Sequence, residues 1–361
     1  MDHELLRAEF PVLSELTYLN AGTCGPLPRA AGAATTVLLH EAERRGRDGA
    51  HYGGLVAAQD ERRARYASLI GGRPQDVALT SSTTEGIVRV LQGLDWSPGD
   101  EVLVAEQEHA GLLGPLAALV AQRGVAVRSA PLEGIVEAVG PGTRLVACSH
   151  VRWTDGALAP AALADLAGEV PVLLDGAQGA GAIHVDVAAL GCAYYAASGQ
   201  KWLCGPIGTG FLWVHPGRRA ELQVRAPGYG NLATPYGGLA TEPWDDARAL
   251  DALTMSAESS VGAVVAMDVL GEAGWDAVVG RAADLAAELA GLLEASGRTV
   301  APRGRTTLVS WSEADPAATR DRLAAAGVVV RDLPGTDLLR ASVGAWNDAR
   351  DLQRLMDVLA G

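Results

Sequence analysis

Two neighbouring segments decide the fold, and they read VPVLLDGAQ (residues 170–178) and AASGQKWLCGPIGTG (residues 196–210). Each begins with a short apolar run and continues into small and polar residues. Continuously apolar runs of this length are typical of strands that are covered on both faces of a sheet. We therefore expect Asp175 to follow one strand directly, and Lys201 to follow another strand of the same sheet.

Similar runs alternate with helical patterns between residues 75 and 215. The runs predict strands over residues 77–80, 101–105, 125–130, 144–149, 170–174, 194–197 and 210–214, and the helical patterns cover 84–94, 112–123 and 161–167. Alternating strands and helices predict a doubly wound, mostly parallel sheet. Ligands of such sheets bind beyond the carboxyl ends of the strands, so the residues that follow each strand are the first candidates for a site.

The pattern changes further along the chain. Residues 215–248 are rich in Gly, Pro and Tyr and predict a long ordered connection. Beyond them we expect helices over 275–295, 316–327 and 347–359, and strands over 305–312, 328–331 and 338–343. Asp315 and Pro316 mark the start of one helix as its N-cap and first helical residue. The chain is thus expected to divide into a large domain (residues 1–255) and a small α+β domain (residues 256–361).

Composition excludes several classes of function. The 361 residues are 48% hydrophobic and 20% charged with a net charge of −14, whereas a nucleic-acid binder needs a basic face. We expect the arginine clusters Arg44–Arg47 and Arg62–Arg65 to be solvated helix faces. No apolar stretch approaches the roughly 18–20 residues that a membrane crossing needs. The cysteines are scattered without CxxC spacing, which predicts no metal site, no disulfide framework and a cytoplasmic protein.

Lys201 is the only lysine among 29 basic residues. Arginine cannot replace lysine where a neutral primary amine is needed, because guanidinium stays protonated. One lysine left by chance in an arginine-rich chain is the alternative, but its place in an apolar, glycine-punctuated turn favours a chemical role. With Asp175 at the neighbouring strand end, Lys201 suits pyridoxal 5′-phosphate (PLP), as the Schiff-base amine opposite an acid on the ring nitrogen. A simple buried ion pair is the alternative.

Three further features lie at, or in, the expected strands. Ser81–Gly86 follows a strand and opens a helix, which suits a phosphate site and equally an ordinary helix cap. His109 would stack on a planar cofactor or be an ordinary polar residue. Arg340 lies within an apolar strand and needs an anion, either a substrate carboxylate or an internal acidic partner. Together these features offer a phosphate cradle, a stacking ring and a carboxylate clamp.

The two opening segments, together with Tyr18–Gly22 and Leu339–Asn347, resemble the signature of class V aminotransferase-like PLP enzymes. The resemblance covers nearly the whole chain, and its Asp/Gln/Lys portion is highly specific. It implies the type I, aspartate-aminotransferase-like fold, with a mostly parallel seven-stranded sheet in the large domain. The family includes cysteine desulfurases, isopenicillin N epimerase-like proteins and cysteine/cystine C–S lyases.

The resemblance also implies roles for single residues. Lys201 would be the Schiff-base lysine and proton shuttle, Asp175 the partner of the ring nitrogen, and His109 the stacking histidine. The remaining cofactor contacts would be Gln178 to the ring hydroxyl and Thr83, Thr84, Ser198 and Gln200 to the phosphate, and the substrate contacts would be Arg340, Asn20 and Trp153. Thr254 would reach the phosphate of the partner subunit's cofactor, which implies a homodimer with shared sites, although the residues around Thr254 depart from the family motif.

Departures from the family patterns suggest the reaction. Cysteine desulfurases carry a nucleophilic Cys shortly before the substrate arginine, and residues 332–337 contain none. Trp153 stands where desulfurases commonly have Asn, which resembles the epimerase-like and C–S lyase branch. Arg152 would bind a second acid group of the substrate or form a surface salt bridge, and Cys24 would approach the site or only occupy a turn.

We therefore expect a C–S β-lyase that acts on a small cysteine-derived amino acid and releases a thiol or persulfide with pyruvate and ammonia. A class V aminotransferase or an amino-acid epimerase is the alternative. A binding protein retired from catalysis would be expected to have lost Lys201 or Arg340, and both are present.

Overall fold

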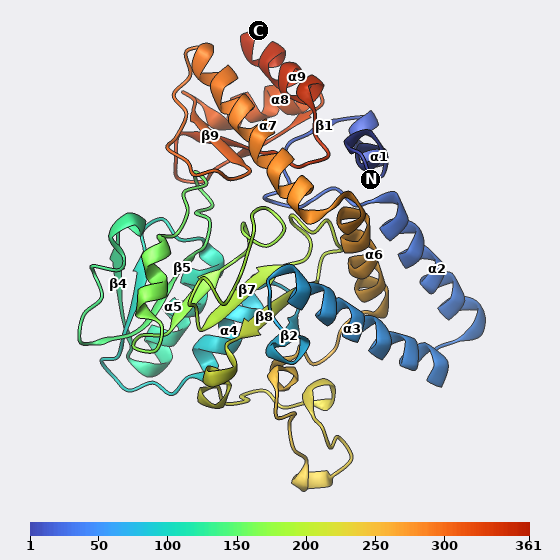
Figure 1. The fold of residues 1–361 in the computed structure, drawn as a ribbon, viewed down its shortest axis with the longest axis vertical. Helices are drawn as coiled ribbons and strands as arrows, with labels where there is room; N and C mark the ends of the chain where they lie inside the picture. Colours follow the sequence, from blue (N-terminus) through green and yellow to red (C-terminus); the bar gives the residue numbers. More distant parts are fainter.

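A seven-stranded sheet forms the centre of the protein, in the order β2–β8–β7–β6–β5–β3–β4 (Figure 1). The computed structural model describes residues 1–361. The strands are β2 (Val77–Thr80), β3 (Glu101–Ala105), β4 (Ala126–Ala130), β5 (Thr143–Ser149), β6 (Val172–Asp175), β7 (Tyr194–Ser198) and β8 (Gly210–Val214). β8 runs in the opposite direction to the other strands of the sheet, and it is antiparallel to both β2 and β7. The prediction of a mostly parallel sheet is therefore confirmed.

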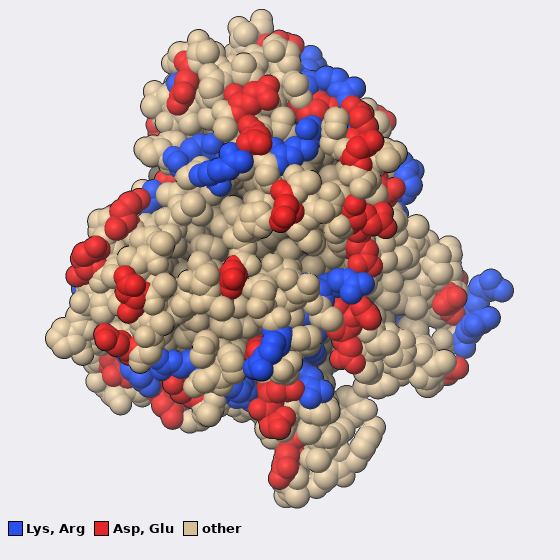
Figure 2. Space-filling model, in the orientation of Figure 1, with Lys and Arg blue, Asp and Glu red and all other residues tan.

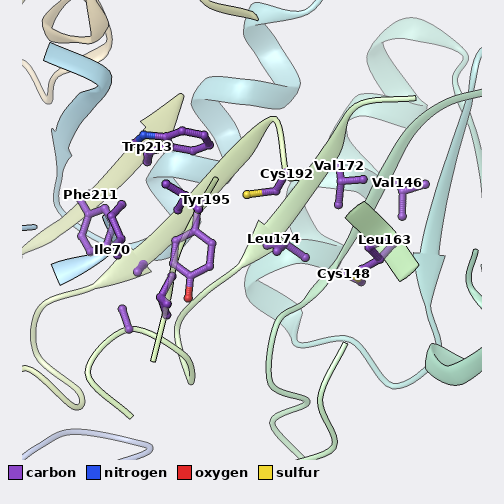
Figure 3. Close-up of a cluster of buried hydrophobic side chains, with 14 of the residues drawn as sticks. Ile70, Val146, Cys148, Leu163, Val172, Leu174, Cys192, Tyr195, Phe211 and Trp213 are labelled. Atoms are coloured by element: carbon purple, nitrogen blue, oxygen red, sulfur yellow. The ribbon is translucent and has the colours of Figure 1, made fainter. Parts of the chain in front are cut away.

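The central strands are continuously apolar because both faces of the sheet are covered. Leu174 and Tyr195 point into one core, part of which Figure 3 shows, whereas Leu173 and Tyr194 point into a second core on the opposite face. Successive side chains of a strand alternate between the faces, so a strand between two cores has no polar face.

Helices cover the two faces of this sheet. Side chains of α4 (Thr83–Gly93) and α5 (Ala110–Arg123) complete one core, and those of α3 (Gly49–Leu69) and α6 (Ala257–Ala273) contribute to the other. The long helix α2 (Arg29–Arg45) packs against α6. The side chains of Ser82 and His109 cap α4 and α5, which therefore begin slightly before the predicted helices. The predicted helix over 161–167 is a short 3-10 helix (Ala161–Leu166).

A second, three-stranded antiparallel sheet in the order β11–β12–β9 lies apart from the first (Figure 1). Its strands are β9 (Leu308–Ser312), β11 (Arg331–Asp332) and β12 (Leu338–Ser342), and it packs with α7 (Trp275–Ala295), α8 (Pro316–Ala325) and α9 (Ala349–Ala360). The division of the chain at residue 255 stays a prediction.

The single strand predicted over residues 328–331 is wrong. β10 (Val328–Val329) pairs with β1 (Thr17–Tyr18) near the start of the chain, and a separate strand, β11, then pairs with β12. β1 and β10 form a separate two-stranded sheet, and hydrophobic periodicity contains no information about such a distant partner. The predicted connection over 215–248 contains short 3-10 helices rather than strands.

Figure 2 shows acidic and basic side chains intermixed over the visible face, without a large basic patch. None of the helices combines the length and the apolar character that a membrane crossing requires.

The solvated face predicted for Arg62–Arg65 is wrong for its first two residues. Arg62 and Arg63 are 0% and 5% exposed, because α3 packs with this face towards the protein. Both guanidinium nitrogens Nη1 and Nη2 of Arg63 donate to the carboxylate of Asp251, at 3.0 and 2.7 Å. Asp251 also accepts the backbone N–H of Leu79 in β2, so this ion pair ties α3 and residue 251 to the edge of the sheet.

Replacing Asp251 by Ala should lower the free energy of unfolding by about 3–5 kcal/mol, because the charge of Arg63 is left buried without a partner. Urea unfolding followed by circular dichroism measures the change. Asp321→Ala, which removes the exposed partner of Arg320, is the control and should leave the free energy of unfolding nearly unchanged. Equal effects of the two substitutions would contradict the role assigned to the buried pair.

Candidate active site

The candidate residues meet at one edge of the large sheet. β3, β5, β6 and β7 are parallel, so their carboxyl ends lie side by side. Asp175 ends β6, Ser198 ends β7, and Lys201 lies in the turn that follows. His109 caps α5 after β3, and the hydroxyl of Thr83 at the start of α4 lies 2.6 Å from that of Ser198. The fold therefore gathers an amine, a carboxyl, an imidazole and a helix N-terminus.

Asp175 and Lys201 influence each other's charge. Asp175 is buried, and its carboxylate accepts one hydrogen bond, from the backbone N–H of Ala177 at 2.9 Å. Burial raises the pKa of this carboxyl, and the positive charge of Lys201 opposes the rise. Burial also lowers the pKa of Lys201 to about 8; the Asp175 charge opposes this fall, and the charge of Arg340 adds to it. A usable fraction of the amine is therefore neutral near neutral pH, as a nucleophilic amine must be.

The first turn of α4 forms the candidate phosphate cradle. Ser82 caps the helix by accepting the N–H of Glu85 at 3.1 Å. The N–H groups of Thr83 and Thr84 lie at the positive end of the helix, where anions bind. Gly210 allows β8 to come close, since a Cβ there would lie 2.9 Å from the nitrogen of Ser82. In the turn after β7, the side-chain oxygen of Gln200 is buried without a hydrogen-bond partner.

Thr254 is not part of this cluster. It is exposed and lines, with Tyr52, Tyr229 and Trp244, a separate cavity between α3 and residues 229–255. Its expected contact with the cofactor of a partner subunit stays a prediction.

Gln178 and His109 are fixed by the surrounding protein. Gln178 donates to the carbonyl of Gly22 at 2.8 Å and accepts from the indole of Trp202 at 2.9 Å, which leaves one N–H and one lone pair for a ligand. The Nδ1 of His109 accepts the N–H of Gly111. Burial and the nearby cation Lys201 lower the pKa of His109 to about 4, so its ring is neutral and carries its proton on Nε2. A neutral, oriented imidazole suits stacking on a planar ring.

Arg340 is 0% exposed and has no acidic partner. Its Nη1 donates to the carbonyl of Trp153 at 2.7 Å, whereas Nε and Nη2 have no hydrogen-bond partner. Burial and the charge of Arg331 lower the pKa of Arg340 to about 9. The internal salt bridge weighed from the sequence is therefore absent, and two buried donors of one guanidinium await an anion. Gly22 leaves the space open, because a Cβ there would lie 3.1 Å from Nη2.

Sequence reasoning left the role of Arg152 open and missed Arg331. Arg152 pairs with Asp155 at 2.6 Å and with Glu133 at 3.4 Å, as in the salt-bridge alternative. Arg331 lies opposite Arg340 in the β11–β12 pair, 6.0 Å above the ring of Trp153, and forms no salt bridge. Its only side-chain hydrogen bond is to the hydroxyl of Thr23, at 3.3 Å. An arginine at the end of the predicted strand that precedes the strand of Arg340 was the available signal.

Glu108 is a second buried carboxyl that sequence reasoning missed. Its two oxygens accept the N–H and the hydroxyl of Ser149, at 2.7 and 2.6 Å. Ser149 is paired in register with Asp175, so the two carboxyls lie close together. Burial and the charge of Asp175 raise the pKa of Glu108 to about 7, although the hydrogen bonds from Ser149 oppose the rise. The position of Glu108 next to His109 was the only signal in the sequence.

These side chains fit PLP. No side chain hydrogen-bonds to the buried carboxylate of Asp175, so a protonated ring nitrogen would supply the missing donor. Lys201 offers the amine, and the first turn of α4 offers the anion site. The orphaned nitrogens of Arg340 lie at the opposite end, where a substrate carboxylate would bind.

Glu108→Gln should change how stability depends on pH. The proton of Glu108 stabilises the folded state below the ordinary pKa of 4.5, and this contribution is lost as pH rises through about 7. Glutamine does not ionise, and its amide oxygen can accept the N–H of Ser149 while its amide nitrogen donates to the Ser149 hydroxyl. The variant should therefore gain roughly 2–3 kcal/mol of unfolding free energy relative to the wild type between about pH 5 and pH 8. Urea unfolding across this range measures the difference, and a constant difference would contradict the assignment.

The chain is similar in sequence to several curated proteins. It is 31% identical to a probable cysteine desulfurase of Pseudomonas aeruginosa, in a match that covers 96% of this chain and 95% of that protein. It is 35% identical to the isopenicillin N epimerase of Amycolatopsis lactamdurans, where the match covers 55% of this chain and 53% of the epimerase.

The fold is similar to that of a C–S lyase. The structure of the cystine C–S lyase C-DES with its reaction product cysteine persulfide superposes with a TM-score of 0.91 at 26% identity, covering 97% of this chain and 99% of that one. Another structure of C-DES has glycine covalently linked to its PLP cofactor. The sequence model of the family described as aminotransferase class-V matches residues 18–355. The protein therefore belongs to the class V aminotransferase family of PLP-dependent enzymes.

Proposed function

We propose that this PLP-dependent enzyme is a C–S β-lyase that acts on a cysteine-derived amino acid and releases a thiol or persulfide with pyruvate and ammonia. The observation that carries the choice of substrate is the pair Arg340 and Arg331, which lie opposite each other in the β11–β12 pair without an acidic partner, and the choice of a lyase rests on the similarity to C-DES and on the turn without cysteine described below. One guanidinium suffices for the α-carboxylate of any amino acid. The second favours a substrate with another carboxylate at its far end, as in cystine.

Bound PLP supplies an electron sink for the charge that develops on the substrate Cα. Lys201 Nζ, neutral in part because burial lowers its pKa to about 8, takes the Cα proton. Asp175 would keep the proton on the ring nitrogen, and the first turn of α4 with Ser198 would hold the phosphate. Neutral His109 would stack on the ring without adding a positive charge that competes with that proton.

At the substrate end, Nε and Nη2 of Arg340 donate to the α-carboxylate. The bond between Cβ and sulfur would then break and its electron pair leave with sulfur, which takes the proton that Lys201 removed from Cα and leaves as a thiol or persulfide. Water converts the remaining three-carbon fragment to pyruvate and ammonia.

The turn between β11 and β12 supports release of sulfur into solution. It consists of residues 333–337 and contains no cysteine. Cys24 is half-buried, and burial raises the pKa of its thiol, which disfavours the thiolate needed for nucleophilic attack. The proposed enzyme therefore carries no sulfur on a desulfurase-type cysteine.

A cytoplasmic homodimer belongs to the same proposal. Large apolar side chains are exposed on α2, on α3 and on the segment that contains Tyr229, Tyr236 and Leu239. This segment projects from the body of the protein (Figure 1) and continues to Thr254. Exposed apolar side chains of this kind are typical of an interface between subunits.

Incubating the PLP-loaded protein with cystine, cysteine and S-substituted cysteines, without a keto acid, should give pyruvate over many turnovers. Lys201→Ala should remain folded and give none, because no neutral amine is left to take the Cα proton. Lactate dehydrogenase-coupled detection of pyruvate and chiral analysis of the amino acid measure the outcome. Turnover only after a keto acid is added would identify an aminotransferase, and interconversion of enantiomers without pyruvate would identify an epimerase; either result contradicts the lyase.

Substitution of the two arginines separates their proposed roles. Arg340→Met should raise KM at least about 10-fold for every substrate, because a charge-assisted hydrogen bond to the α-carboxylate is lost. Arg331→Met should raise KM by a similar factor for cystine and leave S-methylcysteine within about 2-fold of the wild type. Steady-state kinetics with both substrates make the comparison. Equal effects of Arg331→Met on the two would remove the support for a second carboxylate.

A further inference from the structure

Gln107 has an unusual backbone conformation in the turn between β3 and α5. Its φ angle is 61°, and only one other residue besides glycine, Cys204, has a positive φ. Residues with a Cβ rarely adopt this left-handed region, so a turn that required only the conformation would favour glycine. A glutamine at this position therefore suggests that both its backbone and its side chain form specific contacts.

Both groups of Gln107 hold the segment that follows β5. Its carbonyl accepts the indole N–H of Trp153 at 2.8 Å, and its side-chain oxygen accepts the hydroxyl of Thr154 at 3.3 Å. The Trp153 ring also meets the His109 ring edge-on, with 5.2 Å between centroids. The turn therefore sets the place of Trp153 relative to the imidazole that faces the cofactor site.

The same segment accepts hydrogen bonds from the small sheet. The carbonyl of Trp153 accepts Nη1 of Arg340 from β12, and the carbonyl of Thr154 accepts the hydroxyl of Ser310 from β9 at 2.5 Å. A chain of hydrogen bonds thus runs from Gln107 through Trp153 to Arg340. Because Nη1 is occupied, the guanidinium can present only its Nε–Nη2 edge, which matches the two oxygens of a carboxylate.

We propose that Gln107 is a positioning residue. Its left-handed backbone directs the carbonyl of Gln107 to the indole of Trp153 and so fixes Trp153. The carbonyl of Trp153 in turn holds Arg340 with its Nε–Nη2 edge open to the substrate carboxylate. The proposal rests on the carboxylate-binding role of Arg340 in the proposed function, but it does not depend on the fate of the substrate after binding. In this proposal the backbone carbonyl of Gln107 is required to hold Trp153, whereas its amide side chain only adds the contact with Thr154.

Three substitutions test this chain of contacts. Gln107→Val opposes the left-handed conformation through its branched Cβ, whereas Gln107→Gly permits it and retains the carbonyl. Trp153→Phe keeps a ring but removes the indole N–H. Gln122→Val makes the same chemical change at an exposed position of α5 and is the matched control.

The first readout is the affinity of the PLP-loaded protein for propionate, a carboxylate without an amine, measured by titration calorimetry. Gln107→Val and Trp153→Phe should weaken propionate about 5- to 10-fold, and Gln107→Gly and Gln122→Val should remain within about 2-fold of the wild type. The KM of the amino-acid substrate should rise by the same factors, with kcat and PLP affinity nearly unchanged.

Unchanged propionate affinity in Gln107→Val and Trp153→Phe would overturn the proposal. So would a loss of affinity in Gln107→Val that comes with equal losses of PLP affinity and thermal stability, since the residue would then only support the fold. If the wild type makes no pyruvate but these two variants bind propionate more weakly than the wild type does, the positioning role is supported and the lyase is rejected.

Discussion

The site depends on one constraint, the placement of the Asp175 charge inside the protein at the end of a central strand. A buried carboxylate without a side-chain partner is unfavourable, and a positive ligand together with Lys201 relieves that cost. The residue that follows Asp175 is adapted to this close packing. Gly176 is required because any Cβ would collide with the ring of Tyr195, so the chain passes close beneath the site directly after the aspartate. Lys201, the single lysine, and Asp175 form one electrostatic unit.

Those parts of the fold that follow from local burial could be predicted from the sequence. The strands of the large sheet lie between two cores, and their apolar runs end where Asp175 and Ser198 reach the edge of the sheet. The helix starts at Ser82 and His109 also carry local signals, since capping is a contact within one turn. Contacts between distant segments carry no such signal. The burial of Arg62 and Arg63, and the pairing of β1 with β10, are decided by partners far along the chain.

The candidate site divides in the same way. Asp175, Lys201 and His109 were found because each directly follows a strand, or caps the helix after one, and because a motif specific to the family surrounds Asp175 and Lys201. Glu108, Arg331 and Gln107 were missed because their chemistry depends on what lies opposite them. A carboxyl becomes unusual only when it is buried beside another, an arginine only when it lacks an acid, and a glutamine only when its backbone is left-handed.

The order of the residues in the chain has a consequence for biosynthesis. Gly22 packs against Arg340 and Gln178, and Thr17 pairs with Val328, so the substrate end of the site joins the first part of the chain to nearly the last. The acid, the imidazole and the lysine are all translated well before β12. During synthesis on the ribosome, the chain therefore contains the residues for the cofactor before it contains those for the substrate. A polypeptide released before β12 would contain Lys201 and lack Arg340, the residue proposed to bind the substrate carboxylate.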